Sequence, residues 1–212
     1  YNNQGYVAEF PLDYGNYLYT RDTNSLGYNP EQSKKILQEN GWEYKNKRWQ
    51  KTENYKTKRL NLTLTVNSTN IKRVAVAENI KNQLQDIGIN VTIQKVSDSK
   101  YKQILENKSY EMILTGVYNS YSPDLTSFFG GNNLQNYSNN EINEILSQIK
   151  NIKEEQTLKQ KYERIVNIFF DEQPFIGIYR GRANIVKNQN LAGEIKGNNY
   201  FSYYGLENWY RI

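Results

Sequence analysis

Hydrophobic and polar residues alternate along two segments of the chain and follow a helical spacing in the segment between them. Residues 60–66 alternate Leu or Val with Asn or Thr, which is typical of a strand with one buried face. Residues 70–87 carry apolar side chains three or four positions apart, and Gly88 ends the predicted helix. Alternation returns at residues 89–93. This order predicts a βαβ unit with parallel strands and a right-handed crossover.

Capping residues predict a helix before this unit. Asn29 is a good N-cap, and the proline after it suits the first helical position. Gly41 supplies the left-handed residue that ends the helix. We expect Ile36 and Leu37 to face inward.

The second half of the chain has weaker patterns. Ser138, with Glu141 three residues later, is typical of the capping box of a helix. Residues 116–131 form a loop with a Ser-Pro-Asp turn signal, and we expect the aromatic C-terminus, residues 200–212, to be docked. Together the elements predict a single α/β domain over residues 1–212, built on a mixed sheet that contains the βαβ unit. We also predict helices over residues 99–106 and 155–170 and strands over residues 110–115, 175–179 and 183–186.

The chain contains no His and no Cys among its 212 residues. These absences exclude Ser-His-Asp and Cys-His nucleophile systems, His-ligated metals, disulfides and iron–sulfur clusters. Hydrophobic residues make up only 37% of the chain, but 19 Tyr supply aromatic surface for a core, which argues against disorder. No apolar run approaches the ~20 residues of a membrane span. We therefore expect a folded domain without cofactor or metal.

The net charge of +5 is spread over Lys and Arg residues that are mixed with acidic residues. The densest basic segment is residues 45–58, in which Trp49 and Tyr55 are interleaved. Such a segment is compatible with binding of nucleic acid or a surface polymer, because bases stack on aromatic rings between cations. We favour a solvated, lysine-rich hairpin or loop.

Acidic residues offer little for catalysis. Asp124 is the one acid in an uncharged aromatic loop, and a hydrolase would pair it with Glu111 or Asp171. An Asp that follows Pro in a turn usually caps its own backbone, so we favour that role. Gly130 and Gly131 lack the Lys-Ser/Thr of a phosphate loop, and no dense Asp/Asn array suggests a calcium site.

A binding function is better supported by the loop after the third predicted strand. Ligands of α/β sheets usually bind at the carboxyl ends of the strands. This loop carries side chains that hydrogen-bond and stack, and Tyr offers a large contact area with one polar group. The candidate ligand-binding residues are Tyr118, Asn119, Ser120, Tyr121 and Asp124.

The order of these segments resembles the second lobe of the extracellular solute-binding proteins of family 5, the oligopeptide- and dipeptide-binding components of ABC importers. Residues 28–42 are similar to the family's Y-D-P-E-x-A-K-x-L-L … G-W motif. Residues 112–129 resemble its ligand-side D-x-x-x-x-G-W-x-x-D-x-x-D-P-x-x-F segment. Further matching segments are residues 8–12, 60–66, 77–91 and 136–139.

The resemblance implies one lobe of a periplasmic-binding-protein type II-like fold. It implies a substrate-binding component that captures a peptide or a similar small solute outside the cell, delivers it to ABC permease subunits, and is not an enzyme. The implied partners include an N-terminal lobe of the same protein, and no nucleic acid. In Gram-positive bacteria such proteins are lipoproteins, so an upstream lipid anchor would hold the protein on the outer face of the membrane. A Gram-negative cell would keep it in the periplasm.

The chain departs from the family in the ligand-side segment. Val117 stands where the family has Trp, unless Tyr118 takes that place, and the acidic residue that grips a peptide's α-ammonium falls on or near Ser120. Asp124 matches the later Asp of the motif, which is usually structural. Because a serine cannot neutralise an ammonium group, recognition of a free peptide N-terminus stays open.

Overall fold

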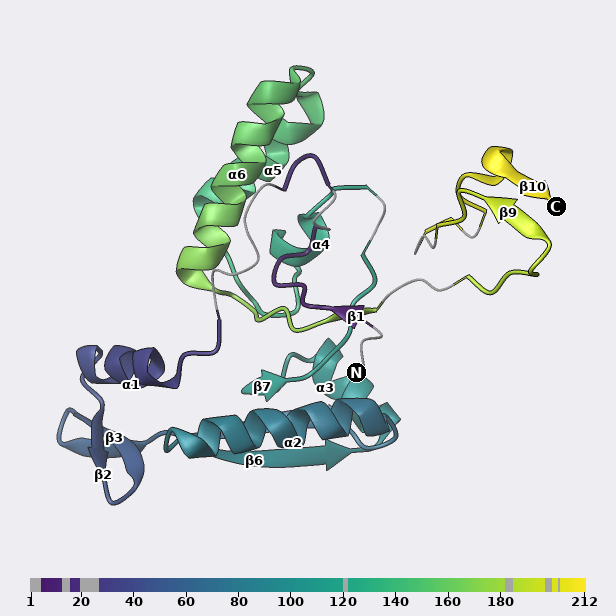
Figure 1. Ribbon diagram of the computed structural model, residues 1–212. Coiled ribbons are helices and arrows are strands. Elements are labelled where there is room, and N and C mark those ends of the chain that lie inside the picture. The colour runs from purple at the N-terminus through teal and green to yellow at the C-terminus, as the bar shows by residue number, and fades with distance from the viewer. Residues whose placement is uncertain are drawn as a thin grey trace. The chain divides into compact units, whose positions relative to one another are not determined.

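A computed structural model describes residues 5–12, 16–19, 27–119, 122–181, 185–196, 200–201 and 203–212 (Figure 1). Contacts divide the chain into two compact units, each with its own buried core. Leu26–Tyr118 form one, which we call the sheet unit. Tyr1–Ser25 and Asn119–Ile212 form the other, which we call the helical unit. The assignment of residues 1–212 to one α/β domain stays a prediction.

A three-stranded parallel sheet lies at the centre of the sheet unit. Leu64 is paired with Ile93 on one side and with Met112 on the other. Helix α2, Ile71–Asp86, connects the first two strands in sequence and packs on both. The predicted βαβ unit and the α/β class are therefore confirmed. The strands, in their order across the sheet, are β6 (Asn90–Val96), β5 (Asn61–Asn67) and β7 (Met112–Ile113).

The parallel and antiparallel pairings that we expected in one mixed sheet lie in separate sheets among the described residues. The basic segment forms an antiparallel meander whose two turns place Asn46, Lys47, Asn54 and Tyr55 at positive φ. Segment 45–58 is thus a lysine-rich hairpin structure. The strands of this meander are β2 (Glu43–Lys45), β3 (Arg48–Glu53) and β4 (Lys56–Arg59).

Helix α1, Pro30–Glu39, begins and ends as predicted. The side chain of Asn29 caps its first turn, and Gly41 follows it with a φ of +79°. Leu37 packs against the core of the sheet unit, but Ile36 is 49% exposed. The expectation that Ile36 faces inward is wrong because α1 contacts the core along a narrow strip and buries none of its residues fully.

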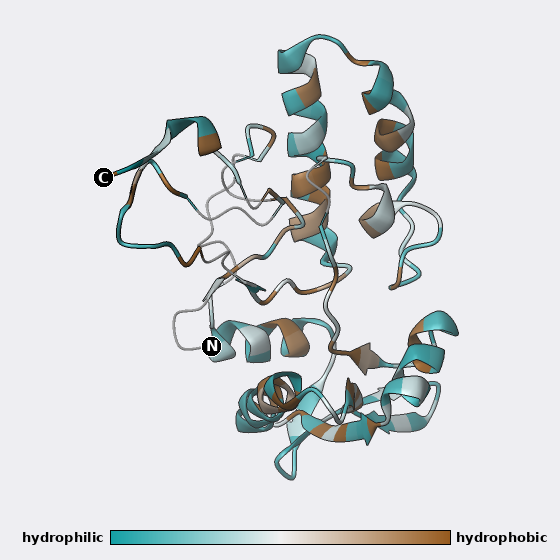
Figure 2. Ribbon diagram, turned by 90° about the vertical axis from the view of Figure 1, so that its right-hand side faces the viewer, coloured by the Kyte–Doolittle hydropathy of each residue, from teal (hydrophilic) through white to brown (hydrophobic). Residues whose placement is uncertain are grey.

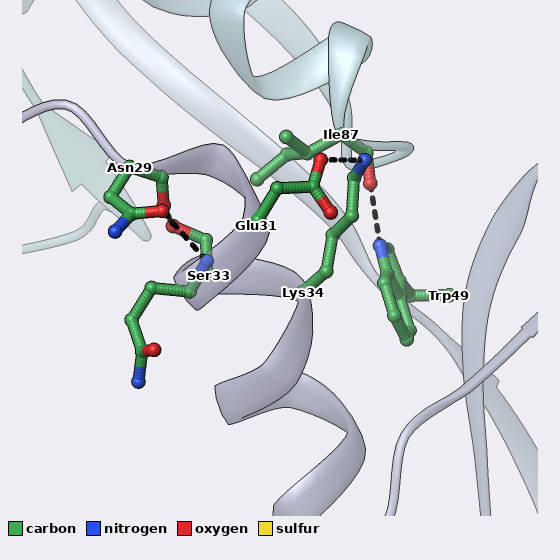
Figure 3. Close-up of polar contacts among 7 residues, drawn as sticks. Asn29, Glu31, Ser33, Lys34, Trp49 and Ile87 are labelled. Atoms are coloured by element: carbon green, nitrogen blue, oxygen red, sulfur yellow. Dashed lines mark hydrogen bonds and ion pairs between the residues drawn. The ribbon is translucent and has the colours of Figure 1, made fainter.

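The core of the sheet unit joins the meander to the βαβ unit. Trp49 is 2% exposed, and its indole Nε1 donates to the backbone carbonyl of Ile87 (Figure 3). Val66 and Ala77 are fully buried beside it in the same cluster. Gly88 ends α2 with a φ of +87°, and a Cβ there would lie 2.3 Å from the ring of Tyr44. The sequence prediction for this helix end is confirmed.

Strand β5 is buried on more than the one face that we predicted. Thr65 is 1% exposed, and its hydroxyl donates to the side-chain carbonyl of Gln94 at 3.0 Å. The cause is helix α3, Asp98–Glu106, which also packs on β5 and buries Tyr101. A polar residue is tolerated in this interior position because its hydroxyl is hydrogen-bonded.

The helical unit is built around aromatic rings. Phe10, Phe129 and Phe169 are almost completely buried, and the rings of Phe10 and Phe169 meet edge to face at 5.2 Å. Figure 2 shows hydrophobic residues alternating with hydrophilic ones along the two long helices of this unit. Its helices are α4 (Thr126–Phe129), α5 (Asn140–Gln148), the short 3-10 helix η2 (Ile149–Asn151) and α6 (Glu155–Glu172).

The N-cap of α5 is Asn139, one residue later than predicted. The Asn139 side chain accepts a hydrogen bond from the backbone N–H of Ile142 at 3.1 Å. Ser138 Oγ instead accepts from the side chain of Asn143. The expected burial of Ile142 and the apolar residues one turn later is confirmed.

Short antiparallel pairs complete the helical unit. No strand lies at residues 175–179, because the pairing begins one residue later. Residues 183 and 184 lie outside the described part, and residues 185–186 are not in a strand. Tyr203 and Tyr210 are 73% and 59% exposed, so the expectation of a docked C-terminus is wrong for these described residues. The pairs are β1 (Gly5–Tyr6) with β8 (Arg180–Gly181) and β9 (Leu191–Gly193) with β10 (Trp209–Arg211), the last preceded by η3 (Leu206–Asn208).

Candidate functional site

The predicted ligand loop follows β7 and crosses from the sheet unit into the helical unit along the chain. Tyr118 is fully exposed, with its ring in solvent. Asn119 is half-buried, and its amide donates to the backbone carbonyl of Pro11. Ser120 and Tyr121 lie outside the described residues. Their role in ligand binding stays a prediction.

Hydrogen bonds hold the loop on both sides of Ser120 and Tyr121. The Pro11 carbonyl that accepts from Asn119 also accepts from Arg180 Nη2 at 2.8 Å. On the other side, the hydroxyl of Tyr162, a residue of α6, donates to the carbonyl of Pro123 at 2.7 Å. Burial raises the pKa of Tyr162 to about 12, with a smaller contribution from the nearby carboxylate of Asp124. The loop ends are thus fixed by buried or half-buried groups of the helical unit.

Asp124 caps its own turn, as its position after proline indicates. One carboxylate oxygen accepts from the Thr126 hydroxyl at 2.5 Å and from the Thr126 backbone N–H at 2.9 Å. These two hydrogen bonds, the hydroxyl's first, lower the pKa of Asp124 below its usual value. Asp124 therefore stabilises the turn before α4.

The acids proposed as catalytic partners are not arranged for catalysis in the described residues. Glu111 accepts a hydrogen bond of 2.6 Å from the backbone N–H of Thr63, so it is engaged at the edge of β5. Asp171 is exposed on α6. Within the described part of the chain, no three acidic side chains gather closely enough to hold a metal ion.

A polar cluster at the carboxyl ends of the parallel strands was missed by sequence reasoning. Asn67, the last residue of β5, donates to Asp98 Oδ1 at 2.9 Å and accepts from Arg73 Nη1 at 2.6 Å. Thr69 donates to the same Asp98 oxygen at 2.6 Å. The hydroxyl of Thr69 and then the amide of Asn67 lower the pKa of Asp98. We call these residues, with Tyr101, the carboxyl-edge cluster.

The guanidinium of Arg73 is held in place from two sides. Besides its bond to Asn67, it lies over the ring of Tyr101, 5.4 Å from the ring centre. The Tyr101 hydroxyl in turn donates to the carbonyl of Leu114, directly after β7, at 2.7 Å. Gly116 leaves space beside Arg73, because a Cβ at Gly116 would come within 3.4 Å of Nη2.

Arg73 can therefore donate hydrogen bonds to a ligand. It is half-buried, and within its guanidinium only Nη1 makes a hydrogen bond to the described residues. A guanidinium fork matches carboxylate and carbonyl oxygens, and its bonds are charge-assisted. The signal that would have found the cluster is simple: Asn67, Asp98 and Gly116 each come at or just after the carboxyl end of a parallel strand.

Within the part of the chain that the structure describes, none of the helices has the length and apolarity needed to cross a membrane.

Comparison with known proteins relates this arrangement to one family. The family model described as bacterial extracellular solute-binding proteins, family 5 Middle, matches residues 1–139. The oligopeptide-binding protein AppA of Bacillus subtilis (strain 168) is 26% identical over 213 residues, which cover 97% of this chain and 38% of AppA. The chain thus spans about two-fifths of the length of this relative.

Solved structures share the fold. The structure of AppA from Bacillus subtilis in complex with a nonapeptide matches with a TM-score of 0.77 at 25% identity, covering 100% of this chain and 43% of AppA. An oligopeptide-binding protein from Thermus thermophilus with a pentapeptide matches at 0.74 and 19% identity, over 85% of this chain and 34% of that one. NikZ from Campylobacter jejuni with Ni(L-His) matches at 0.73 and 17% identity, over 99% and 44%. The last two likenesses show the fold alone.

Proposed function

The chain belongs to the bacterial extracellular solute-binding proteins of family 5, and from this premise we propose that it is part of the substrate-binding component of an ABC importer that captures peptides. One observation carries the proposal: the chain follows, over 100% of its length, the fold of AppA, whose structure holds a nonapeptide. The family resemblance found in the sequence is confirmed. The proposed cargo is a peptide or a similar small solute, and the proposed recipients are the permease subunits.

The geometry of the sheet unit supports peptide capture. A peptide offers a carbonyl oxygen at each residue and a carboxylate at its end. Arg73 has donors that the described residues leave unused, and Tyr118 offers an exposed ring for side-chain contact. Both belong to the carboxyl side of the parallel sheet, where α/β proteins bind their ligands.

We propose that the rest of the binding cleft comes from an N-terminal lobe of the same protein. This chain covers 38% of the length of AppA, which leaves room for such a lobe in a protein of that size. A ligand held between two lobes loses its water, so its hydrogen bonds to the protein become stronger. A lipid anchor upstream would place the protein on the outer face of a Gram-positive membrane; in a Gram-negative cell the protein would act in the periplasm.

The same residues support binding without chemistry, and we propose that the protein is not an enzyme. The carboxylates of Asp124 and Glu111 are each hydrogen-bonded to a backbone N–H and serve the local fold. The alternative of a nucleic-acid or surface-polymer binding domain gains no support from the comparisons, whose relatives are solute-binding proteins.

Calorimetry on the full-length receptor tests the proposal. A nonapeptide should bind to the wild-type protein, and Ser120→Asp should raise the affinity for a free N-terminus by about tenfold, because the new carboxylate pairs with the α-ammonium. An N-acetylated nonapeptide should show no such gain. Asn151→Asp, at an exposed position outside this loop, provides a control that adds the same charge. Absence of heat with any peptide would contradict peptide capture, whereas binding without a gain from Ser120→Asp would contradict only the position of the ammonium site.

A further inference from the structure

The positive charge of the chain is concentrated in the meander β2–β3–β4. Residues 43–59 hold seven basic and two acidic side chains, a net charge of +5, which equals that of the whole chain. The rest of the chain is therefore neutral overall. Every residue of β2 and β4 is exposed, so this charge faces solvent.

Ion pairs within the meander engage only part of this charge. Glu43 pairs with Lys45, and Glu53 pairs with Lys51 at 2.9 Å and with Lys58 at 3.2 Å. The hydrogen bonds from Lys51 and then Lys58 lower the pKa of Glu53. The carboxylate of Glu53 is therefore engaged by these two lysines. Four exposed cations of the meander form no ion pair with the described residues: Lys47, Arg48, Lys56 and Arg59.

The meander presents these cations from a fixed platform. Trp49 buries one face of β3 in the core of the sheet unit. Because side chains alternate along a strand, Arg48 lies on the opposite, outward face, and Arg59 joins it there because it is paired with Gln50. Lys47 lies in the β2–β3 turn.

An aromatic ring stands beside one of these cations, Lys56, at the tip of the other turn. Tyr55 follows β3 in the β3–β4 turn, next to Lys56, and its side chain is fully exposed. The backbone of Tyr55 has a φ of 62°, a conformation that Tyr seldom adopts, so folding alone does not favour Tyr at this position. A tyrosine with an apolar ring and a polar hydroxyl suits the boundary between a bilayer and water.

We propose that this meander is a docking surface for an anionic lipid bilayer. The family is extracellular, so the surface of a bacterial membrane is within reach of its members. Lys and Arg beside an anionic bilayer are attracted by its surface potential within about one Debye length, ~10 Å at moderate salt. Lys47, Arg48 and Arg59 lie at one end of the meander and Lys56 lies at the other. Cations spread in this way match a diffuse planar charge better than a single strand of nucleic acid does. This contact would orient the sheet unit toward the membrane and is independent of cargo.

Vesicle co-sedimentation tests the proposal with the 212-residue chain. The probes are vesicles with roughly one-third phosphatidylglycerol in phosphatidylcholine, and pure phosphatidylcholine vesicles. We expect binding only to the anionic vesicles, and a loss of at least about tenfold when salt rises from about 0.05 M to about 0.5 M. Absence of binding to anionic vesicles at low salt would overturn the proposal.

Two variants with the same net charge distinguish binding through the meander from binding that depends only on the net charge of the chain. The quadruple variant Lys47→Gln, Arg48→Gln, Lys56→Gln, Arg59→Gln should lower vesicle binding by about tenfold or more. The control changes four exposed lysines outside the meander that form no ion pair with the described residues, Lys72, Lys100, Lys150 and Lys153, to Gln and should keep most of the binding. An equal loss in both would overturn the proposal, provided that circular dichroism shows both folded.

Tyr55 distinguishes a bilayer from a soluble polyanion. Tyr55→Asn, which suits the positive φ, should weaken vesicle binding severalfold and leave binding to soluble polyphosphate unchanged. A chain that binds polyphosphate more tightly than vesicles, or vesicle binding that is unaffected by Tyr55→Asn, would show that the partner is an anionic polymer and not the bilayer.

Discussion

The indole Nε1 of Trp49 donates a hydrogen bond of 2.6 Å to the backbone carbonyl of Ile87, the residue that caps the C-terminus of α2 (Figure 3). Trp49 belongs to the antiparallel meander and Ile87 to the βαβ unit. This bond therefore connects two sheets that share no strand pairing among the described residues. A buried donor and a helix-end carbonyl satisfy each other, which removes two desolvation penalties at once.

Trp49→Phe should lower the free energy of unfolding by about 1–3 kcal/mol, because it removes this bond and some buried ring surface. Trp209→Phe is the matched control: its indole N–H is buried without a hydrogen-bond partner among the described residues, so the same truncation breaks no bond. Urea denaturation followed by circular dichroism measures both. Equal losses in the two variants would contradict a stabilising role for the Trp49 bond.

Asp124→Asn should reduce the sensitivity of the helical unit to acid. The pKa of Asp124 is lowered in the fold, so its contribution is present above the unfolded pKa of about 4 and is lost as pH falls through the lower folded value. Because Asp124 is exposed, we expect a loss below about 1 kcal/mol at neutral pH. Thermal melts of the wild type and the variant across the acidic range measure how steeply the melting temperature of each falls with pH. A variant that keeps the wild-type slope would contradict this cap.

Tyr162→Phe should change stability at alkaline pH. The pKa of Tyr162 is raised to about 12 by burial, so the fold favours the neutral phenol. The contribution of Tyr162 to the free energy of unfolding is complete below the unfolded pKa of about 10, and it is lost as pH rises toward the folded value. The variant should lose about 1 kcal/mol of the free energy of unfolding at neutral pH. Its free energy of unfolding should also fall less steeply with pH on the alkaline limb of the stability curve. Tyr55→Phe, at a fully exposed position, should leave that limb unchanged.

Lys108→Gly should stabilise the sheet unit by about 0.5–1 kcal/mol. Lys108 follows α3 with a φ of 51°, and the next N–H, from Ser109, donates back to Ile104 in the manner of a glycine-ended helix. Lys102→Gly, inside the same helix, is the control and should destabilise by about 1 kcal/mol. Chemical denaturation should show changes of opposite sign in the free energy of unfolding of the two variants. Changes of the same sign would contradict the strain at Lys108.

Arg73→Gln should weaken the binding of a nonapeptide to the full-length receptor by about tenfold or more, because charge-assisted donors at the carboxyl edge are lost. This prediction rests on the proposed function. Lys72→Gln removes the same charge from the adjacent, exposed position and should change affinity little. Calorimetry measures both. A similar effect of the two variants would show that Arg73 acts only through its charge and not through the carboxyl-edge cluster.

The candidate site was predicted in part. The loop after β7 and the turn role of Asp124 follow from local chemistry, since strand ends and Ser-Pro-Asp turns are written in neighbouring residues. The carboxyl-edge cluster was missed because Asn67 ends a strand, and Arg73 and Asp98 stand in the first turns of helices, where polar residues are ordinary. Only the parallel pairing of their strands brings them together.

Local sequence determined what depends on neighbouring residues: the βαβ alternation, the left-handed ends at Gly41 and Gly88, and the amphipathic helices of the second half. Tertiary structure decided what depends on distant partners. Thr65 is buried because α3 returns over β5, and Phe10 enters the aromatic core because Phe129 and Phe169 lie across from it. Side-chain spacing encodes which face of an element is apolar, but burial also requires a second element to cover that face, and the element that does so is set by packing of the whole chain.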